Sequence, residues 1–359
     1  MIRVSEMVLP GHPDKVCDII ADAIVAEAYR ADRHAYAQVE AGIWCDSIWL
    51  SGSVAASVVI EKQIDEIVRD TLNSIGLRGV NTIAANDYTI TCNVGVTCED
   101  PIPWTHHVND QAVVIGWAGY DSKTRYLPPE HFLAHTFREA LTVSCRSGAL
   151  QGEGPDGKLM VRMREEGNRW SLEHLLVTLQ QRQSTPFTEL CGTVSNELKG
   201  AYQKAQESDG RWITPWKNVE IVINPNGPFI EGCSLSDNGQ TGRKLVMDFY
   251  GPRIPIGGGA LSGKHLTHID RAGAYAARQA AVTALTTGAK ECMVMAVYSP
   301  NINEPLEVIY EMSGRGTRLP NSWFGHNVVA ERLLQQPFDR DTAEGLHFWG
   351  VAYGWNRGY

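Results

Sequence analysis

The sequence predicts an α+β protein of two layers, built from three pseudo-repeats in which a helix, two strands and a second helix follow one another. This order recurs three times along 359 residues, without internal sequence identity. A chain of this length exceeds one ordinary hydrophobic core. We therefore expect three units, over residues 1–120, 121–215 and 216–359, each packing helices on a sheet.

The first unit opens with a helical pattern directly after Gly-His-Pro-Asp-Lys at 11–15. Apolar residues from Val16 to Ile24 recur on one helix face. Pro13 suits the first helical turn, and Asp14 suits the positive end of the helix. His12 and Asp14 are candidate functional residues, and capping of the helix is the alternative role for both. Strand-like runs follow at 37–44 and 48–54, and a helix at 61–75 ends at Gly76.

The second and third units repeat this order with different residues. The second has helices at 129–145 and 188–205 around strands at 159–163 and 172–179, and the third has helices at 270–287 and 326–335 around strands at 292–298 and 306–312. Strands at 88–96 and 219–224 lie between the units, and we expect them to extend the sheets. A further strand is predicted at 245–250.

Composition limits the function classes. The chain is 43% hydrophobic and 20% charged, and no apolar run approaches the roughly 18 residues of a membrane span, so a soluble cytoplasmic protein without a membrane partner is expected. A net charge of −9 argues against nucleic acid as a partner. The eight cysteines include no C-x-x-C pair, which favours reduced core thiols over disulfides or zinc.

The stretch 257–278 predicts a phosphate-binding loop that leads into a helix. Four of its first seven residues are glycine, so backbone N–H groups can approach a ligand, and Lys264 adds a positive charge. A true P-loop is disfavoured, because His265 replaces its Ser or Thr and the helix begins later, with Thr267 as its predicted N-cap. A structural glycine turn is the alternative, but it does not account for Asp270.

Two histidine pairs occur in the sequence, and only the first has the spacing of metal ligands on a helix. His131 and His135 are four apart on a predicted helix, but they lack a third ligand, so a polar helix face is the interpretation. His106 and His107 lie in a Pro- and Trp-containing stretch at 101–109 that we expect to be a mobile loop near a site.

Three further segments carry candidate ligand contacts. Asn-Pro-Asn-Gly-Pro-Phe at 224–229 predicts a turn that exposes Phe229 for stacking on a base, although a core phenylalanine is the alternative. Arg243 and Lys244 end a glycine-broken loop at 237–244, where a guanidinium and an ammonium suit a polyphosphate, with a solvated strand end as the alternative. Pro-Asp-Gly-Lys at 155–158 offers a turn lysine.

Taken together, GHPDK at 11–15, PDGK at 155–158, NPNGPF at 224–229, TGRK at 241–244 and GGGALSGK with the later IDR at 257–271 resemble the S-adenosylmethionine synthetase (methionine adenosyltransferase) family. The motifs occur in family order over nearly the whole chain. The resemblance implies three αβ repeats with interleaved boundaries. It also implies active sites between two subunits, hence a homodimer, with a tetramer as a further option.

The family's reaction joins methionine sulfur to C5′ of ATP, expelling triphosphate that is then hydrolysed to pyrophosphate and phosphate. The resemblance implies the following roles. The catalytic residues are His12, Lys158, Arg243, Lys244 and Lys264; the nucleotide contacts are Lys15, Asp110, Asp156, Phe229 and Asp237; Mg²⁺ is bound by Asp14 and Asp270, and K⁺ by Glu40. Cations are what a triphosphate leaving group requires, and Mg²⁺ prefers such oxygen ligands.

The departures from the family pattern concern the amino acid substrate. Ser53 stands where the family has a glutamate for the methionine ammonium, and His268 where it has a lysine near the carboxylate. The lid segment, here 98–110, is shortened, and His107-Val-Asn precedes the Asp110-Gln111 pair. Losing charged hydrogen bonds of about 1.5–3 kcal/mol each would weaken methionine binding by orders of magnitude.

The sequence therefore predicts an ATP-dependent adenosyltransferase that forms a sulfonium from methionine or from another small sulfur acceptor. Ser53, His106, His107 and His268 are expected to line the acceptor pocket. Two alternatives stay open: a non-catalytic ATP-binding paralogue that regulates a synthetase, and an enzyme that retains only tripolyphosphatase activity.

Overall fold

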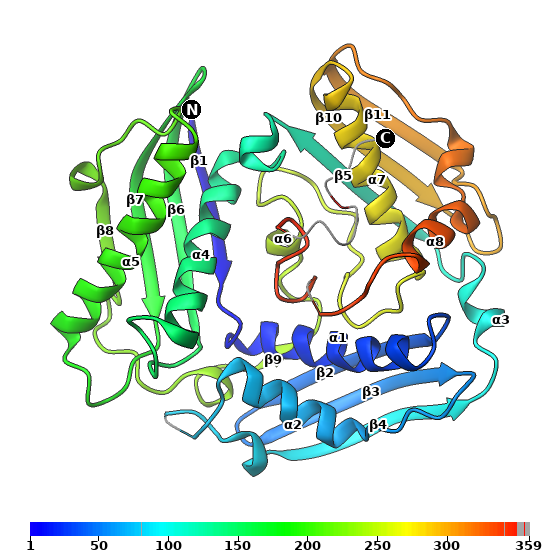
Figure 1. Cartoon of the computed structure of the whole chain (residues 1–359), viewed down its shortest axis with the longest axis horizontal. Coiled ribbons are helices and arrows are strands. Elements are labelled where there is room, and N and C mark those ends of the chain that lie inside the picture. Colours follow the sequence, from blue (N-terminus) through cyan, green and yellow to red (C-terminus); the bar gives the residue numbers. More distant parts are fainter. Residues whose placement is uncertain (80, 341, 350–354, 356–359) are drawn as a thin grey trace.

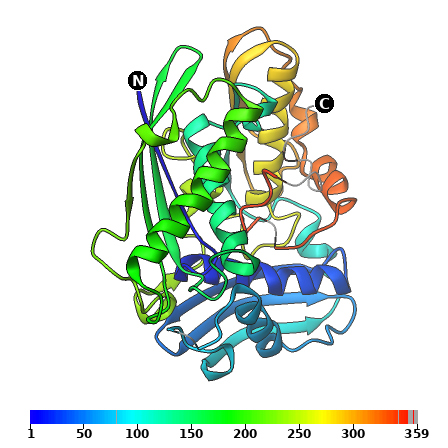
Figure 2. The same ribbon diagram turned by 60° about the vertical axis from the view of Figure 1, so that its left-hand side comes forward.

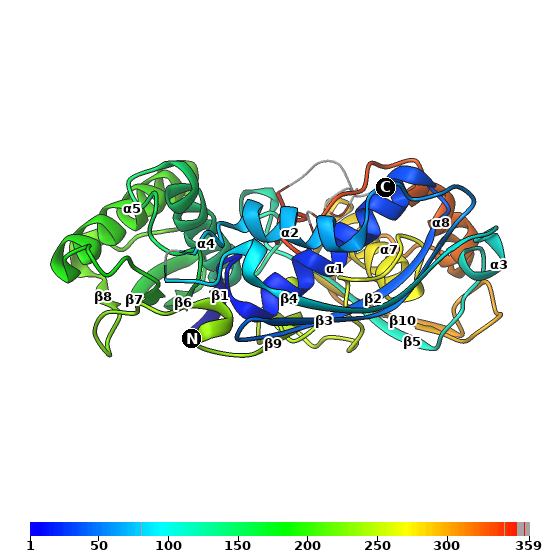
Figure 3. The same cartoon turned by 90° about the horizontal axis from the view of Figure 1, so that it is seen from below.

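The computed structural model describes residues 1–79, 81–340, 342–349 and 355. Three helix-backed sheets surround a common centre, which contains the short helix α6 and the described residues that follow α8, drawn in red (Figure 1). Seen from below, the helices lie on one side and the sheets on the other, which makes a two-layer slab (Figure 3). This is the α+β architecture that the sequence predicts.

The first sheet has the order β4-β3-β2-β9 and is covered by α1 and α2. Its strands are β2 (Tyr36–Trp44), β3 (Ser47–Ala56), β4 (Thr89–Cys98) and β9 (Gly239–Gln240). Helix α1 (Pro13–Ala31) starts with proline in its first turn, and α2 (Ile64–Ile75) stops where Gly76 takes the left-handed conformation. Alternate residues of β2 are buried against the helices, so its other face stays open.

The second sheet has the order β1-β6-β7-β8, with α4 and α5 on its helical side. It contains β1 (Ile2–Val8), β6 (Gly157–Glu166), β7 (Arg169–Leu179) and β8 (Glu220–Ile223), and its helices are α4 (Pro129–Ser147) and α5 (Phe187–Ser208). The third sheet, β11-β10-β5, packs against α7. Its elements are β5 (Ala112–Gly119), β10 (Ala289–Tyr298) and β11 (Glu307–Gly314), with α7 (Ile269–Thr286) and α8 (His326–Leu334).

Each sheet includes one strand from a distant part of the chain. β1 pairs with β6, with Ile2 opposite Arg164, and in Figure 2 the dark-blue N-terminal strand runs along the green strands. β5 pairs with β10, and β9 joins β2. Single-turn helices complete the order: α3 (Ile102–Thr105), α6 (Leu245–Asp248), η1 (Ala85–Asp87), η2 (Ser122–Thr124), η3 (Trp216–Asn218), η4 (Cys233–Leu235) and η5 (Asn321–Phe324).

The structure confirms most predicted elements. The strands expected at 88–96 and 219–224 extend two sheets as the parallel partners of β3 and β7. The strand predicted at 245–250 is wrong, because Leu245–Asp248 forms α6 between two ion-paired ends, Lys244 with Asp14 and Asp248 with Lys15. β1 and β5 were not predicted.

Two expectations about side chains are corrected. Thr267 is not the cap of α7, because its hydroxyl bonds to the Thr105 carbonyl while His268 caps the helix. All eight cysteines are free, but Cys92 and Cys98 are exposed rather than in the core. Among the described helices, none is long and apolar enough to cross a membrane.

The expected polar face of His131 and His135 is instead buried. Both rings lie in the interior, where Phe348 of the C-terminal segment packs edge-on against each of them. Ser5 Oγ lies 2.9 Å from His131 Nδ1, and His347 nearby donates its Nε2 proton to the Asp248 carbonyl. Burial lowers the pKa of His131 to about 4 and that of His347 to about 3. These rings are therefore neutral at pH 7.

This burial predicts a loss of stability in mild acid. The folded pKa of His131 lies below the unfolded value of about 6.5, so the unfolded chain binds the proton more tightly and stability falls as pH drops from about 6.5 toward 4. At pH 5 the loss from this ring is about 2 kcal/mol. Urea unfolding at pH 7 and pH 5 should show a smaller pH effect in His131→Asn, and an unchanged one in the partly exposed control His174→Asn. Equal pH effects in all three proteins would contradict the prediction.

Candidate active site

Two helices begin with the same arrangement of histidine and aspartate. His12 caps α1 by accepting the Asp14 N–H at Nδ1 over 3.2 Å, and His268 caps α7 by accepting the Asp270 N–H at the same distance. In each case the aspartate side chain lies 4.0 Å from the ring nitrogen. An aspartate in the first turn faces the positive end of the helix. The two helix starts thus form equivalent half-sites.

An acidic stripe on α1 links these half-sites. Asp14, Asp18 and Asp22 are spaced four apart and so share one helix face. Their carboxylates accept the backbone N–H groups of Gln240, Gly242 and Gly263 respectively, at 2.8 to 2.9 Å. The stripe therefore fixes both glycine-containing loops against α1.

The same two loops also pair with the free edge of β2. Val39 donates to the Gly263 carbonyl and His265 to the Ala37 carbonyl, each at 2.8 Å, while Thr241 bonds to Ala41. Gly263 has a φ of +79°, and a Cβ there would lie 2.2 Å from the Val39 carbonyl oxygen. Only glycine fits this close approach.

Each half-site pairs its carboxylate with cations. Lys244 contacts Asp14, and Arg243 Nε lies 3.4 Å from the same carboxylate. Lys264 binds Asp270 at 2.6 Å. A Cβ on Gly259 would lie 2.4 Å from the Asp270 carboxyl carbon, so the glycine run leaves this carboxylate close to backbone. Two compact pairs of opposite charge therefore lie at two helix N-termini.

These residues fit Mg²⁺. In the described part of the chain, no three His, Cys, Asp or Glu side chains gather as a metal site by themselves. Asp14 and Asp270 each offer one carboxylate, and Mg²⁺ is typically held by one or two carboxylates together with substrate phosphates. Glu40, on the open face of β2, offers one oxygen donor; its burial raises its pKa although Lys264 opposes this. A single exposed carboxylate on this face is compatible with K⁺.

The ring of His12 is neutral and its tautomer is fixed. Burial, and then the charge of Lys244, lower its pKa to about 4. Because Nδ1 accepts the Asp14 N–H, the proton of the neutral ring is on Nε2. His12 is therefore a hydrogen-bond donor on its side away from the helix.

The segment with Asp156 and Lys158 adjoins the start of α1. Leu9 donates to the Gly157 carbonyl and Gly11 to the Pro155 carbonyl, so the two segments are joined by backbone bonds. Asp156 is buried and accepts the Cys233 N–H at 2.8 Å, and burial raises its pKa to about 7. Lys158 is half exposed and binds Glu6 at 2.7 Å. Asp156 thus anchors the loop that carries the exposed Asp237.

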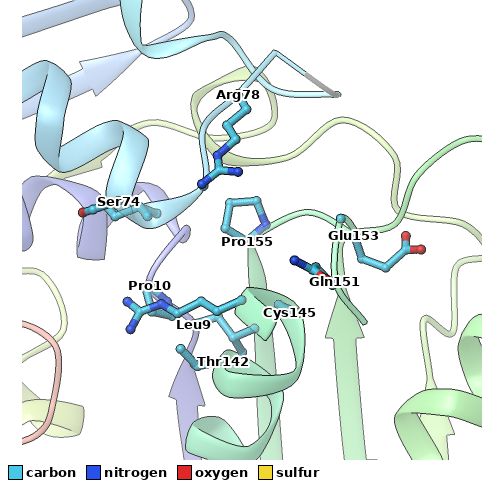
Figure 4. A pocket seen from close by; sticks show the side chains of 13 residues that line it. Leu9, Pro10, Ser74, Arg78, Thr142, Cys145, Gln151, Glu153 and Pro155 are labelled. Atoms are coloured by element: carbon cyan, nitrogen blue, oxygen red, sulfur yellow. The ribbon is translucent and has the colours of Figure 1, made fainter. Parts of the chain in front are cut away.

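A cavity of about 500 Å³ lies beside these joined segments (Figure 4). Pro10 and Pro155 contribute to its wall, and Figure 4 shows Arg78 directed toward Pro155. None of the predicted site residues is among those that line it. The cavity is therefore distinct from the half-sites.

Some predicted residues lie apart from the half-sites, or their side chains already bind other groups of the protein. The Lys15 ammonium is buried between Asp18 and Asp248, so it faces no ligand. Phe229 is partly buried in the link between β8 and β9, where Asn224 and Gly227 form the predicted turn. Asp110 is exposed just before β5.

The proposed acceptor residues are near the second half-site only in part. Ser53 pairs with Gln38 across β2 and β3, and Gln38 in turn bridges to Lys264. His268 is at the helix start itself. His106 bonds to His34 at 2.9 Å, while His107 is partly buried in the same segment.

Sequence reasoning missed Asp18, Asp22 and Arg271. Asp22 binds the buried Arg271 of α7 at 2.6 Å and so joins the two half-sites. The i, i+4, i+8 spacing of acids within an otherwise apolar helix was the available signal, since buried carboxylates require partners.

The fold and the site define the class: a three-sheet α+β protein with paired lysines and aspartates at two helix N-termini, an arrangement suited to a phosphorylated substrate. Comparison with known proteins is more specific. The S-adenosylmethionine synthetase N-terminal domain model matches residues 1–98, and the C-terminal domain model matches 231–347.

Curated relatives agree. The S-adenosylmethionine synthase of Rhodospirillum centenum is 30% identical over 324 residues, covering 88% of this chain and 81% of the relative. That of Acholeplasma laidlawii is 29% identical over 360 residues, covering 97% and 89%. An unusual S-adenosylmethionine synthetase from Campylobacter jejuni shares the fold, with a TM-score of 0.85 and 24% identity over 99% of this chain and 97% of that one. The chain belongs to the S-adenosylmethionine synthetase family, whose members are ATP-using transferases.

The link between the half-sites predicts a large stability effect. Asp22→Ala leaves the guanidinium of Arg271 buried without its carboxylate, and we expect a loss of about 3–5 kcal/mol in urea unfolding. The control Asp65→Ala removes an exposed pair with Arg69 and should cost about 1 kcal/mol or less. Similar losses of unfolding free energy in the two variants would show that the buried pair of Asp22 stabilises the fold no more than an exposed pair.

Proposed function

We propose that the chain is an ATP-dependent adenosyltransferase that joins a sulfur acceptor to C5′ of ATP and releases triphosphate, which is then hydrolysed to pyrophosphate and phosphate. The observation that carries the proposal is the pair of matching half-sites, Asp14 with Lys244 and Asp270 with Lys264. Family membership supports ATP as the substrate. The acceptor is methionine or another small thioether or thiol.

Charge neutralisation is the main catalytic contribution in this proposal. Triphosphate leaves only if its developing negative charge is stabilised by groups already in position. Lys158, Arg243, Lys244 and Lys264 can supply that charge, and the α1 stripe holds the loops that carry the last three near β2. Asp14 and Asp270 would hold Mg²⁺, which would neutralise phosphate oxygens and leave the lysines free to bind the substrate.

His12 serves as a donor to the departing group. Its Nε2 proton points away from the helix, since Nδ1 is bonded to the Asp14 N–H. The N–H of a neutral imidazole can stabilise negative charge on the oxygen that leaves C5′ without the ring first gaining a proton. Asp156 and Asp237 would position the ribose side, and Phe229 would stack on adenine. Glu40 would hold K⁺.

The acceptor side differs from what the family resemblance implies. Ser53 offers no charge for an ammonium group, and His268 is a neutral helix cap rather than a lysine. Burial and the charge of Lys264 lower the pKa of His268 to about 3. His106 and His107 border the same region. Methionine would therefore bind through other contacts, or the natural acceptor has no charged amino acid head.

The open sheet faces support assembly as at least a homodimer. Large apolar side chains are exposed on strands of two sheets, including Trp44, Trp49, Val113 and Ile309, each 41–47% exposed. Burying such side chains against a second copy would be favourable. Sedimentation velocity of the purified chain tests this, and a one-chain species would contradict it.

Mass spectrometry tests the reaction itself. Purified chain is incubated with ATP, Mg²⁺ and K⁺, with and without L-methionine or other thioethers, and adenosyl products and triphosphate are followed. We expect an adenosyl sulfonium and polyphosphate products. Polyphosphate release without any adenosyl product would favour hydrolysis only, and ATP binding without turnover would favour a regulatory paralogue.

The position of Lys264 in its half-site predicts a fall in kcat when this lysine is replaced. Lys264→Met removes a preorganised cation, and we expect kcat for adenosyl transfer to fall by about 10²–10³. Lys62→Met is the control, because Lys62 forms an exposed pair with Asp70 away from the half-sites and its loss should leave kcat within about twofold. Equal kcat values for all three proteins would remove Lys264 from the catalytic machinery.

A further inference from the structure

The cavity of about 500 Å³ lies where the first two sheets and their helices meet. Its wall is formed by the ends of α2 and α4, by the two residues that follow β1 and by the loop at 151–155 that precedes β6. Small-molecule sites typically have volumes of about 300–1,000 Å³ and often lie at such junctions. The cavity therefore has the size and the position of a site for a small organic molecule.

Part of the wall is apolar and firmly held. Leu9, Pro10, Ile75 and Pro155 line the cavity, and Leu9 and Ile75 are buried. The Gly11 N–H donates to the Pro155 carbonyl at 3.1 Å, and a Cβ on Gly11 would lie 2.5 Å from the carbonyl carbon of Pro155. The two segments are thus in direct contact, and this part of the wall is already formed for the apolar body of a ligand.

Two arginines line the same cavity. Arg78 is exposed, and Figure 4 shows its side chain directed toward Pro155. Among the described residues, its guanidinium has no hydrogen bond or ion pair. Arg146 lies 3.5 Å from Glu344, whose carboxylate is closer to Arg340, at 2.9 Å. Both guanidinium groups of the wall therefore have N–H donors available for a carboxylate or a phosphate.

The acidic residue of the wall, Glu153, already has other partners. Its carboxylate accepts the Arg182 N–H at 2.5 Å and the Thr185 hydroxyl at 2.6 Å, and Arg182 Nε lies 3.9 Å away. In the view of Figure 4 this carboxylate points away from Arg78. Burial raises the pKa of Cys145, another residue of the wall, to about 12, so its thiol is neutral at pH 7. Neither side chain compensates the charge of the lining arginines.

The two helix ends account for only part of this positive charge. A helix C-terminus carries about half a negative charge, so the ends of α2 and α4 together offset about one of the two arginine charges. The Gly76 N–H also donates to the Leu72 carbonyl, and the Gly148 N–H to the Ser144 carbonyl, which satisfies part of each end. A positive charge is left at the cavity, in a chain whose net charge is −9.

We propose that this cavity is a second ligand site, which binds a small organic anion with one phosphate or carboxylate group on an apolar body. The anionic group binds Arg78 and Arg146, and the apolar body packs against Pro10 and Pro155. Binding includes no covalent step. The inference goes beyond the proposed adenosyl transfer and does not depend on it, because occupancy of the cavity is measured without turnover.

Isothermal titration calorimetry of the purified chain tests the ligand class. The probes are phenyl phosphate and benzoate, with inorganic phosphate and phenol as the anionic part and the apolar part alone. At least one of the two aromatic anions should bind with a Kd below about 1 mM, and inorganic phosphate and phenol should each bind at least about tenfold more weakly. The tighter of the two aromatic anions identifies the anionic group.

Variants place the bound probe in the cavity. Arg78→Met and Arg146→Met should each weaken binding of the tighter aromatic anion by at least about tenfold, since each removes a charge-assisted hydrogen bond. Arg169→Met is the control, because it removes an exposed arginine of β7 that does not line the cavity, and its Kd should match the wild type. Lys264→Met, which alters a half-site, should also leave this Kd unchanged. Urea unfolding of each variant checks that the fold is retained.

The opposite results would overturn the inference. If inorganic phosphate binds as tightly as the aromatic anions, the apolar wall has no part in binding. If phenol binds as tightly, the arginines have none. If Lys264→Met weakens binding and Arg78→Met does not, the probe occupies a half-site and the cavity is not a ligand site. A failure to detect adenosyl products would refute the proposed function and leave these binding results as they are.

Discussion

The acidic stripe of α1 is the interaction on which the site depends. Three carboxylates on one helix face hold three backbone N–H groups from two loops that are distant in sequence, and Asp22 adds a buried ion pair with α7. A loop held only by its own turns would be mobile. Because the stripe belongs to a helix packed on its sheet, the loops that carry the cations are held against the rigid core. The residues that position the cations therefore also stabilise the fold.

Within each half-site, the negative and positive side-chain charges largely compensate one another. Each aspartate has a lysine at its helix N-terminus, so the site carries little uncompensated charge before a substrate binds. This matters in a chain of net charge −9, since free lysines would otherwise attract other anionic partners and free aspartates would repel ATP.

The sequence could predict that the glycines, Lys264 and Asp270 form one local group, because they lie within 14 residues of one another. Most helices and strands followed from periodicity for the same reason. The pairings of β1 and β5 were not predictable, since their partners lie far along the chain and leave no local signal. His131 and His135 were misassigned because a distant segment, with Phe348, covers their helix face. His268 was noticed as a departure from the family, yet its role as a cap equivalent to His12 required the backbone geometry.

The exchanged strands have a consequence for how the chain is made. β1 is synthesised first, but its partner β6 begins at Gly157, so β1 stays unpaired until more than a third of the chain has been made. The separation along the chain is larger for β5, whose partner is β10. Such long-range pairings raise contact order and leave strand edges unpaired during synthesis. No sheet is built from the strands of a single predicted unit, so a break between any two units would separate strands that belong to the same sheet.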